Sequence, residues 1–155
     1  MGVPPEDVDP VLWHHPTRKR VGYFGVVRLR DGKFAFQREE KRFNAVTFHT
    51  FLKYLRKVSS RSGRGVVLII DNARHHHARL HLDWRREQEP HFRLNFLPPY
   101  SPDLNPVERL WKLTRRLCLH NRYFPTLENV VESVESRFRK WTLGSEAIRR
   151  LCAIT

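Results

Sequence analysis

Residues Val66–Ile70 form an unbroken run of five aliphatic side chains, and this run constrains the fold more than any other part of the sequence. Most of its residues are β-branched, and Asp71 ends it abruptly. Such a run is typical of a central strand that is buried on both faces of its sheet. Because helices must cover both faces of such a sheet, the sequence predicts an α/β fold.

Further strands and helices are predicted on both sides of this run. Residues 21–29 are apolar and β-prone, an Asp31-Gly32 turn follows, and residues 33–37 resume with alternation, which predicts a β-hairpin. Residues 92–97 predict another strand. Helices are predicted at 45–58, at 76–89, from Pro106 to Cys118, and after Thr126. The predicted order, β-β-α-β-α-β-α-α, corresponds to one mixed sheet flanked by helices.

The composition favours a folded domain with a polyanionic partner. The chain has 155 residues, 40% of them hydrophobic, and 29 Lys and Arg against 16 Asp and Glu give a net charge of +13. This charge favours nucleic acid as the partner, although a basic protein without such a partner is the alternative. No segment approaches the roughly 20 apolar residues of a membrane span. Cys118 and Cys152 have no metal-ligand spacing, and so small a cysteine content is typical of a reducing cytoplasm.

Asp71 is the first candidate for a chemical role. It follows the predicted central strand, and open α/β sheets place ligands at the carboxyl ends of such strands. Burying a carboxylate there is costly unless it meets a cation or a hydrogen-bond donor. An Asx turn or a helix cap is the alternative explanation for Asp71.

Glu108 is the second candidate. Asn105 is a good N-cap, Pro106 suits the first helical position, and Glu108 falls at the third, which approaches a capping box and could by itself explain the glutamate. Glu108 lies roughly 115° from the centre of the apolar stripe, and Lys112 and Arg115 lie within about 40° of it. Together with the nearby Arg109 and Arg116, these cations either share a phosphate site with Glu108 or form a solvent-facing surface.

Four histidines, His75, His76, His77 and His81, raise the possibility of zinc. A histidine pair at positions i and i+4 supplies only two ligands, and no HExxH pattern or cysteine pair completes a site. Neutral hydrogen-bonding or phosphate-facing histidines are favoured over zinc.

Two stretches together resemble a known family. They read VLIIDNARHHHARL and NFLPPYSPDLNPVERLW, and 36 residues separate Asp71 from Glu108. They resemble the catalytic domain of DDE transposases of the mariner superfamily, especially the bacterial insertion-sequence branch. The shared features are a strand-end Asp followed by Asn-Ala-Arg-x-His, the proline-rich loop, and Glu-x-Leu-Trp at a helix start. The stretch GYFGVVRLRDGKF and the predicted helix at 45–58 extend the likeness, which weakens after about residue 143.

The resemblance implies an RNase H-like fold and metal-dependent DNA cleavage and strand transfer in transposition. It implies a two-metal site for Mg²⁺ or Mn²⁺, with Asp71 and Glu108 as catalytic metal ligands. DNA, as element ends and target, would be the partner, with phosphates near Arg74, Arg109, Lys112, Arg115 and Arg116. The resemblance further implies a bacterial cytoplasmic, nucleoid-associated protein that forms a homo-oligomer or assembles with an upstream transposase portion.

The sequence departs from the family pattern at its start. The first catalytic acid belongs on a strand ahead of the hairpin, whereas Asp7 and Asp9 lie among prolines and Asp31 lies in the turn. No helix-turn-helix precedes it. We therefore expect the C-terminal part of a split or truncated enzyme that lacks the first strand, has an exposed sheet edge and cuts DNA weakly or not at all alone. The expected division is an irregular lead-in at 1–17, a partial domain at 18–143 and a tail at 144–155.

Two other functions remain open at this stage. One is a non-catalytic DNA-binding remnant that regulates a full-length transposase. The other is a different RNase H-like nuclease, which acts on RNA–DNA hybrids or junctions.

Overall fold

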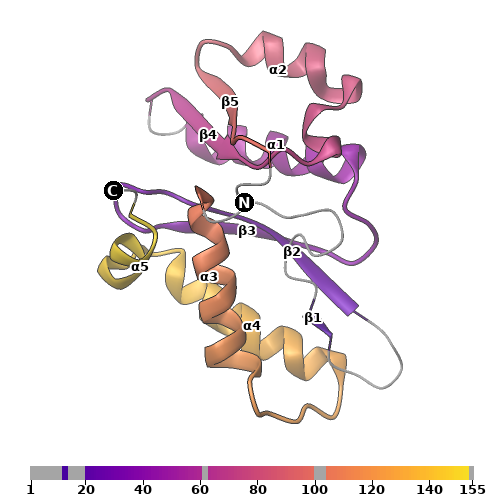
Figure 1. The fold of residues 1–155 in the computed structure, drawn as a ribbon, viewed down its shortest axis with the longest axis vertical. Helices are drawn as coiled ribbons and strands as arrows, with labels where there is room; N and C mark the ends of the chain where they lie inside the picture. The colour runs from indigo at the N-terminus through magenta and orange to yellow at the C-terminus, as the bar shows by residue number, and fades with distance from the viewer. Residues whose placement is uncertain (1–11, 14–19, 61–62, 100–103, 154–155) are drawn as a thin grey trace.

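The fold was analysed in a computed structural model that describes residues 12–13, 20–60, 63–99 and 104–153. The strands and helices follow one another as Figure 1 shows. The elements are β1 (Leu12–Trp13), β2 (Arg20–Val27), β3 (Phe34–Glu39), α1 (Ala45–Ser59), β4 (Val66–Ile70), α2 (Leu82–Gln88), β5 (Phe92–Phe96), α3 (Pro106–Thr114), α4 (Leu127–Trp141) and α5 (Glu146–Leu151).

The described strands form two sheets. Strands β1, β2 and β3 are antiparallel, whereas β4 and β5 are parallel, and no hydrogen-bonded ladder joins the two groups in the described residues. The described strands therefore show the antiparallel and the parallel pairing of the predicted mixed sheet, but they form two separate groups. The prediction that β4 is buried on both faces is wrong at Val67, which is 49% exposed. Among the described strands, β4 pairs with β5 alone.

The predicted hairpin is confirmed. The N–H of Arg28 donates to the carbonyl of Lys33, and the N–H of Gly32 donates to the carbonyl of Arg28, each at 2.8 Å. Gly32 has a φ of +73°, which a glycine adopts without steric cost. A side chain there would collide with the backbone of Ser145, so this glycine also lets the turn pack against the start of α5.

Helix α1 confirms the prediction at 45–58 and extends it by one residue. The side chain of Asn44 accepts hydrogen bonds from the N–H groups of Val46 and Thr47, each at 3.0 Å. The hydroxyl of Thr47 in turn accepts from the N–H of Asn44, which completes a capping box. The buried face of α1 consists of Phe48, Phe51, Leu52 and Leu55.

Helices cover the two faces of the β2–β3 hairpin. Phe24 stacks on Phe51 of α1, with 5.1 Å between the ring centroids. The adjacent Tyr23 points to the opposite face, where its ring meets Phe138 of α4 edge-on at 5.1 Å. Successive strand residues alternate between faces, so α1 lies on one side of the hairpin and α4 on the other (Figure 1). This arrangement explains why β2 is apolar throughout instead of alternating.

A partly buried ion pair links this hairpin to α4. Oε2 of Glu135 accepts hydrogen bonds from the hydroxyl of Tyr23 at 2.7 Å and from Nε of Arg38 at 2.5 Å. The side chain of Glu135 is buried, and burial by itself raises the pKa of a carboxyl group. The two donors, Arg38 the stronger, outweigh this effect and keep the pKa of Glu135 below its usual value.

Gly25 allows close packing between β2 and α3. A Cβ at this position would lie 2.5 Å from the Trp111 ring and 2.8 Å from the Phe34 ring. Gly25→Ala is therefore expected to lower the free energy of unfolding by about 1–3 kcal/mol through overpacking. Urea denaturation checks this value. Gly65→Ala is the matched control, because its Cβ would find no heavy atom closer than 3.8 Å, and an equal loss in both variants would contradict the packing argument.

The predicted helix at 76–89 is only partly correct. Two 3₁₀ turns, Arg74–His77 and Arg79–His81, precede α2, which begins at Leu82. Ala78 separates the two turns with an extended backbone (φ −61°, ψ 144°) and therefore interrupts the helix. Hydrogen bonds from histidine side chains to the neighbouring backbone replace those of a regular helix.

The predicted helices after residue 105 are confirmed, with two additions. Helix α3 continues into a π-helical turn at Arg115–Leu119, and α5 forms within the segment predicted as a tail. Cys118 and Cys152 are free thiols and both are buried. No helix within the described ranges is long and apolar enough to cross a membrane. Residues 1–11 and 14–17 of the predicted lead-in, with Asp7 and Asp9, lie outside the described residues.

Candidate metal centre and nucleic-acid surface

Asp71 lies at the carboxyl end of β4, as the sequence predicts. Its Oδ1 accepts a hydrogen bond from the N–H of Ala73 at 3.0 Å, so the Asx turn that was the alternative explanation is present. The same oxygen lies 2.9 Å from Nδ1 of His76. The side chain of Asp71 is nevertheless 20% exposed, so its carboxylate is held in place and still reaches solvent.

His76 orients this carboxylate. Its side chain is buried, and Nδ1 lies 2.9 Å from Oδ1 of Asp71 and 3.1 Å from the Asp71 carbonyl oxygen. Nε2 is buried without a hydrogen-bond partner. A buried N–H without an acceptor is costly, so we assign the proton to Nδ1, which donates it to Asp71. The Asn-Ala-Arg-x-His motif marks His76 in the sequence, but only the fold reveals its contact with Asp71.

Two of the other histidines, His77 and His81, make contacts within the protein. Nε2 of His81 donates to the His75 carbonyl at 2.8 Å, and Nδ1 of His81 accepts from Nε of Arg85 at 3.0 Å. Both ring nitrogens of His81 are therefore occupied. The ring of His77 stacks on Phe96 with 3.9 Å between centroids. No group of three or more His, Cys, Asp or Glu side chains suited to a metal occurs among the described residues.

Two of these histidines, the half-buried His75 and the buried His81, are expected to make the chain less stable in mild acid. Burial, reinforced by the neighbouring His76, lowers the pKa of His75 to about 4, and burial also lowers the pKa of His81. An unfolded histidine has a pKa near 6.5. As the pH falls from about 6.5 towards 4, the unfolded chain therefore binds more protons than the folded chain, which favours unfolding. Stability should therefore be fully present above pH 6.5 and decline below it.

Thermal unfolding between pH 7.5 and 4.5 measures this decline. His75→Gln should weaken the dependence of Tm on pH, whereas the same change at the exposed His120 serves as the matched control. A Tm that rises as the pH falls over this interval would refute the assignment.

Glu108 lies in the first turn of α3, whose start confirms the predicted N-terminus. The side chain of Asn105 accepts from the N–H of Val107 at 3.4 Å, and the N–H of Glu108 donates to the Asn105 carbonyl at 3.1 Å. Pro106 occupies the beginning of the helix. Glu108 is half-buried, which fits the position on the flank of the apolar stripe that the sequence predicts.

The start of α3 and strand β4 line the same cavity. We call this cavity of about 890 Å³ the β2–β4 cleft. The residues that define it include Val26 and Val27 of β2, Leu55 and Val58 of α1, Val66, Val67, Leu68 and Ile69 of β4, and Asn105, Pro106 and Val107 of α3. Asp71 follows β4 directly and Glu108 follows Val107 directly, but neither acid is among the residues that line the cleft.

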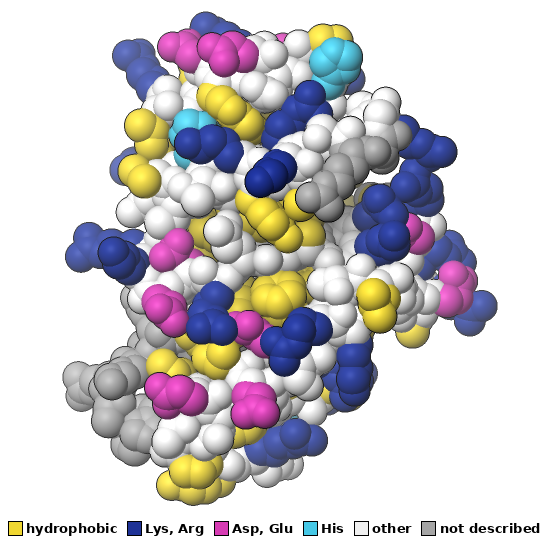
Figure 2. All heavy atoms as spheres, turned by 180° about the vertical axis from the view of Figure 1, so that it is seen from behind, with side chains coloured by type: hydrophobic (Ala, Val, Ile, Leu, Met, Phe, Trp, Pro, Cys, Tyr) yellow, Lys and Arg dark blue, Asp and Glu magenta, His cyan; other side chains and the backbone are white. Residues whose placement is uncertain are grey.

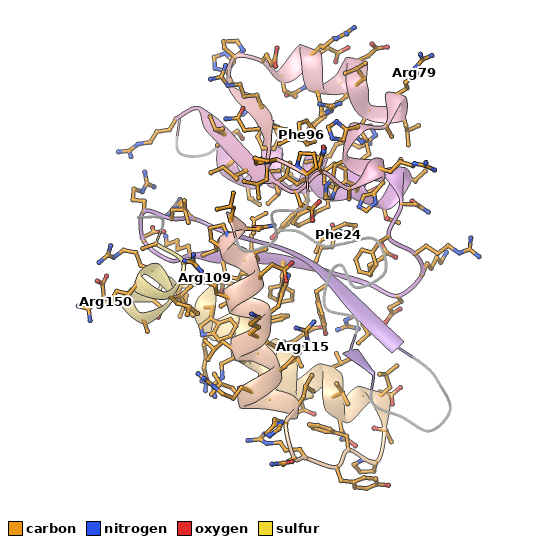
Figure 3. The ribbon with its side chains drawn as sticks, viewed as in Figure 1. Phe24, Arg79, Phe96, Arg109, Arg115 and Arg150 are labelled. Atoms are coloured by element: carbon orange, nitrogen blue, oxygen red, sulfur yellow. The ribbon has the colours of Figure 1, made fainter. Side chains whose placement is uncertain are left out.

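The basic residues fall into two groups. Arg74, Lys112, Arg115 and Arg116 are exposed. Arg109, in contrast, is half-buried, and its Nη1 donates to the carbonyls of Leu151 and Ala153 at 3.1 and 2.9 Å. Arg109 points from α3 towards α5, whereas Arg115 lies on the other side of the helix (Figure 3). The side chain of Arg109 therefore ties α5 to α3, a role that the helical wheel could not indicate.

The match to a family profile decides the family. Residues 2–131 match the profile described as DDE superfamily endonuclease. The chain belongs to this family. This match includes Asp71 and Glu108 and ends within α4, so α5 lies beyond the matched residues.

Two bacterial proteins are similar to this DDE endonuclease in sequence. An uncharacterized protein of Sinorhizobium fredii (strain NBRC 101917 / NGR234), y4pE/y4sA, is 38% identical over 92 residues, which cover 56% of this chain and 64% of that protein. The insertion element IS630 uncharacterized 39 kDa protein of Shigella sonnei is 32% identical over 91 residues, which cover 59% of this chain and 26% of that protein. The matched region thus spans less than two thirds of either relative.

Solved structures of the Mos1 mariner transposase share the fold. Its catalytic domain superposes with a TM-score of 0.67 at 16% identity, covering 93% of this chain and 76% of that one. The Mos1 strand transfer complex gives a TM-score of 0.66 at 19% identity and covers 91% of this chain and 41% of that one. This likeness confirms the predicted RNase H-like α/β fold.

Proposed function

We propose that this chain is part of a transposase that cleaves and joins DNA, and that Asp71 and Glu108 are two of its metal-binding carboxylates. The observation that carries the proposal is the position of Asp71, which lies at the carboxyl end of β4 with its carboxylate held by His76 and partly exposed. The start of α3, immediately before Glu108, borders the same cleft as β4. This arrangement suits two acids acting on one phosphate.

The donor set fits a hard divalent cation in chemical type. Mg²⁺ and Mn²⁺ favour oxygen ligands, and Mg²⁺ is commonly bound by one or two carboxylates together with water and substrate phosphates. Asp71 and Glu108 would supply such carboxylates, and His76 would fix the orientation of Asp71. When bound, a pair of such ions activates the attacking oxygen and stabilises the leaving oxygen of the phosphodiester. The Mos1 catalytic domain was itself solved with Mn.

DNA is the proposed partner because the exposed cations gather on and around the helix that carries Glu108. Lys112 lies on α3, Arg115 and Arg116 follow in the π-helical turn, and Arg74 lies three residues after Asp71. Lysine and arginine side chains are also spread around the face shown in Figure 2. Such cations neutralise phosphates whatever the base sequence, which would deliver DNA to the two acids.

Arg115→Ala is expected to weaken duplex binding by a similar factor on unrelated sequences. The slope of log K against log salt concentration should decrease by about 0.9 for each phosphate that the variant no longer neutralises. Fluorescence anisotropy at several salt concentrations measures both quantities. Arg150→Ala is the matched control, since Arg150 is exposed on α5 and pairs with Glu146. A changed sequence preference in Arg115→Ala would refute the assignment to phosphate.

The experiment that tests the function is incubation of the purified chain with supercoiled plasmid and Mn²⁺. We expect slow nicking, because two carboxylates provide poor ligation for two divalent ions. Fast nicking that Asp71→Ala abolishes would support the proposed metal site and show that our expectation of an incomplete enzyme is wrong. Nicking that persists undiminished in Asp71→Ala would overturn the proposal. Tight DNA binding with no nicking at any metal concentration would instead favour the non-catalytic regulator.

A further inference from the structure

Helix α5 connects the β2–β3 hairpin to the first turn of α3. At its N-terminal end, the N–H of Ser145 donates to the carbonyl of Asp31 in the hairpin turn at 3.3 Å. At its C-terminal end it lies against α3, from which the side chain of Arg109 points towards it (Figure 3). Between the two ends, Ile148 is buried in the core with only 2% of its surface exposed. Both ends of α5 are therefore anchored, each to a different element.

The guanidinium of Arg109 satisfies the backbone at the end of α5. The last carbonyls of a helix have no partner within it, and a positive charge there also interacts favourably with the helix dipole. Nη1 of Arg109 donates to the carbonyl of Leu151, the last residue of α5, and to that of Ala153. A helix of six residues is not stable in water by itself, so α5 depends on tertiary contacts of this kind.

A second contact joins the end of α5 to the beginning of α3. The thiol of Cys152 is fully buried, and Sγ donates to the carbonyl of Pro106 at 3.6 Å. Pro106 is the first residue of α3. Glu108 thus lies between the two residues of α3, Pro106 and Arg109, that α5 contacts.

These contacts fix the direction in which Glu108 points. Successive residues of a helix are about 100° apart around its axis, so Glu108 and Arg109 face different directions. Arg109 faces α5, which leaves Glu108 on another side of α3. A rotation or fraying of the first turn would break the contacts of Arg109 and Cys152, so both contacts oppose any movement of the Glu108 backbone.

We propose that Arg109 is a positioning residue, which acts through α5 to hold the first turn of α3 in the orientation that lets Glu108 bind a divalent cation. The inference rests on the proposed function, because Glu108 is assigned to the metal only there. It gives a role to a cation that the sequence placed at a phosphate, and to a helix that lies beyond the residues matched by the family profile.

The sign of the change in metal affinity separates positioning from simple electrostatics. Removing a positive charge beside a cation site should strengthen cation binding, because like charges repel. Arg109→Ala should instead weaken Mn²⁺ binding by about tenfold, the lower end of the range for groups that orient metal ligands. Electron paramagnetic resonance of Mn²⁺ titrations on the full chain measures the affinity. Hydrogen exchange should become faster at the amides of residues 107–110.

Three variants serve as controls for Arg109→Ala. Arg150→Ala removes the same charge from an exposed residue of α5 that pairs with Glu146, and it should leave Mn²⁺ affinity within about twofold. Arg109→Lys keeps a charged donor and should recover most of the lost affinity. Val130→Ala opens an ordinary core cavity in α4, so it should lower Tm without changing Mn²⁺ affinity.

A variant of the second contact provides an independent test. Cys152→Ala removes the hydrogen bond to Pro106 without changing any charge. It should weaken Mn²⁺ binding in the same direction as Arg109→Ala but by a smaller factor, and it should also speed exchange at residues 107–110. Circular dichroism verifies that each variant is folded, and Cys152→Ala decides the question if Arg109→Ala is not.

Several results would overturn the inference. Unchanged or tighter Mn²⁺ binding in the folded variants, unchanged exchange at residues 107–110, or an equal loss of affinity in Val130→Ala would each do so. Failure of the proposed function looks different: the unmodified chain then binds no Mn²⁺, or Asp71→Asn binds it equally well. If the inference alone fails, Asp71→Asn is still impaired, whereas Arg109→Ala and Cys152→Ala are not.

Discussion

Asp71→Asn is expected to remove Mn²⁺-dependent nicking and to weaken Mn²⁺ binding by about 100-fold or more. The substitution keeps the size and the hydrogen-bonding capacity of the side chain but removes the negative charge that a hard cation requires. Loss of groups that merely orient metal ligands already costs about 10–100-fold in metal affinity or activity, so loss of a ligand should cost at least as much. Electron paramagnetic resonance of Mn²⁺ titrations and long plasmid incubations measure the two effects.

A matched pair of variants shows whether the effect is specific to the site. Asp83→Asn changes an exposed acid on α2 and should leave Mn²⁺ binding and nicking unchanged. His76→Gln should lower Mn²⁺ affinity by about 10–100-fold, since His76 contacts Asp71 and does not itself reach solvent. Mn²⁺ affinity equal to that of the unmodified chain in Asp71→Asn would remove Asp71 from the metal centre.

Trp111→Ala is expected to lower the free energy of unfolding by about 3–5 kcal/mol, the largest change in stability that we predict. The side chain is fully buried, and its ring meets Phe34 edge-on with 5.8 Å between centroids and lies 6.1 Å from Phe138. Removing it leaves a cavity between β2, β3, α3 and α4. Because 1 kcal/mol corresponds to about 2–4 °C for a chain of this size, Tm should fall by roughly 10 °C.

Tyr123→Ala provides the control for this stability measurement. Tyr123 is 85% exposed, so its removal should change the free energy of unfolding by less than about 0.5 kcal/mol. Urea denaturation of both variants makes the comparison. Since Trp111 lies one turn after Glu108 on α3, Trp111→Ala should also reduce nicking at temperatures where the chain is still folded. Equal stability of the two variants would mean that α3 is not anchored through Trp111.

Much of the local structure was predictable because short-range chemistry determines it. The Asp31-Gly32 turn and the Asn105-Pro106 helix start each depend on residues within a few positions of one another, and both are confirmed. The predicted helix at 76–89 is only partly correct because short-range hydrogen bonds there act against a regular helix. There, hydrogen bonds of His76 and His81 to backbone carbonyls compete with the regular helix, and apolar periodicity carries no information about them.

The candidate site was only partly predictable. Asp71 and Glu108 could be singled out by their positions after a strand and at a helix start, and their roles as metal ligands stay predictions. The contact between His76 and Asp71 depends on how the chain turns after β4. Likewise Arg109 was predicted at a phosphate, but it donates to carbonyls more than 40 positions away, at Leu151 and Ala153. A helical wheel gives the direction of each side chain around one helix. It does not show which residues of other elements contact that side chain.

The sequence alone determined the identity of most strands and helices, the family and the two candidate acids, because periodicity, capping and motif spacing are properties of neighbouring residues. Only the tertiary structure decided that, among the described strands, β4 pairs with β5 alone. The aliphatic run Val66–Ile70 indicates that a strand needs partners, but whether both edges find them depends on which other strands come to lie beside it. That pairing is a long-range property of the folded chain, and it turned a predicted central strand into one wall of a cleft.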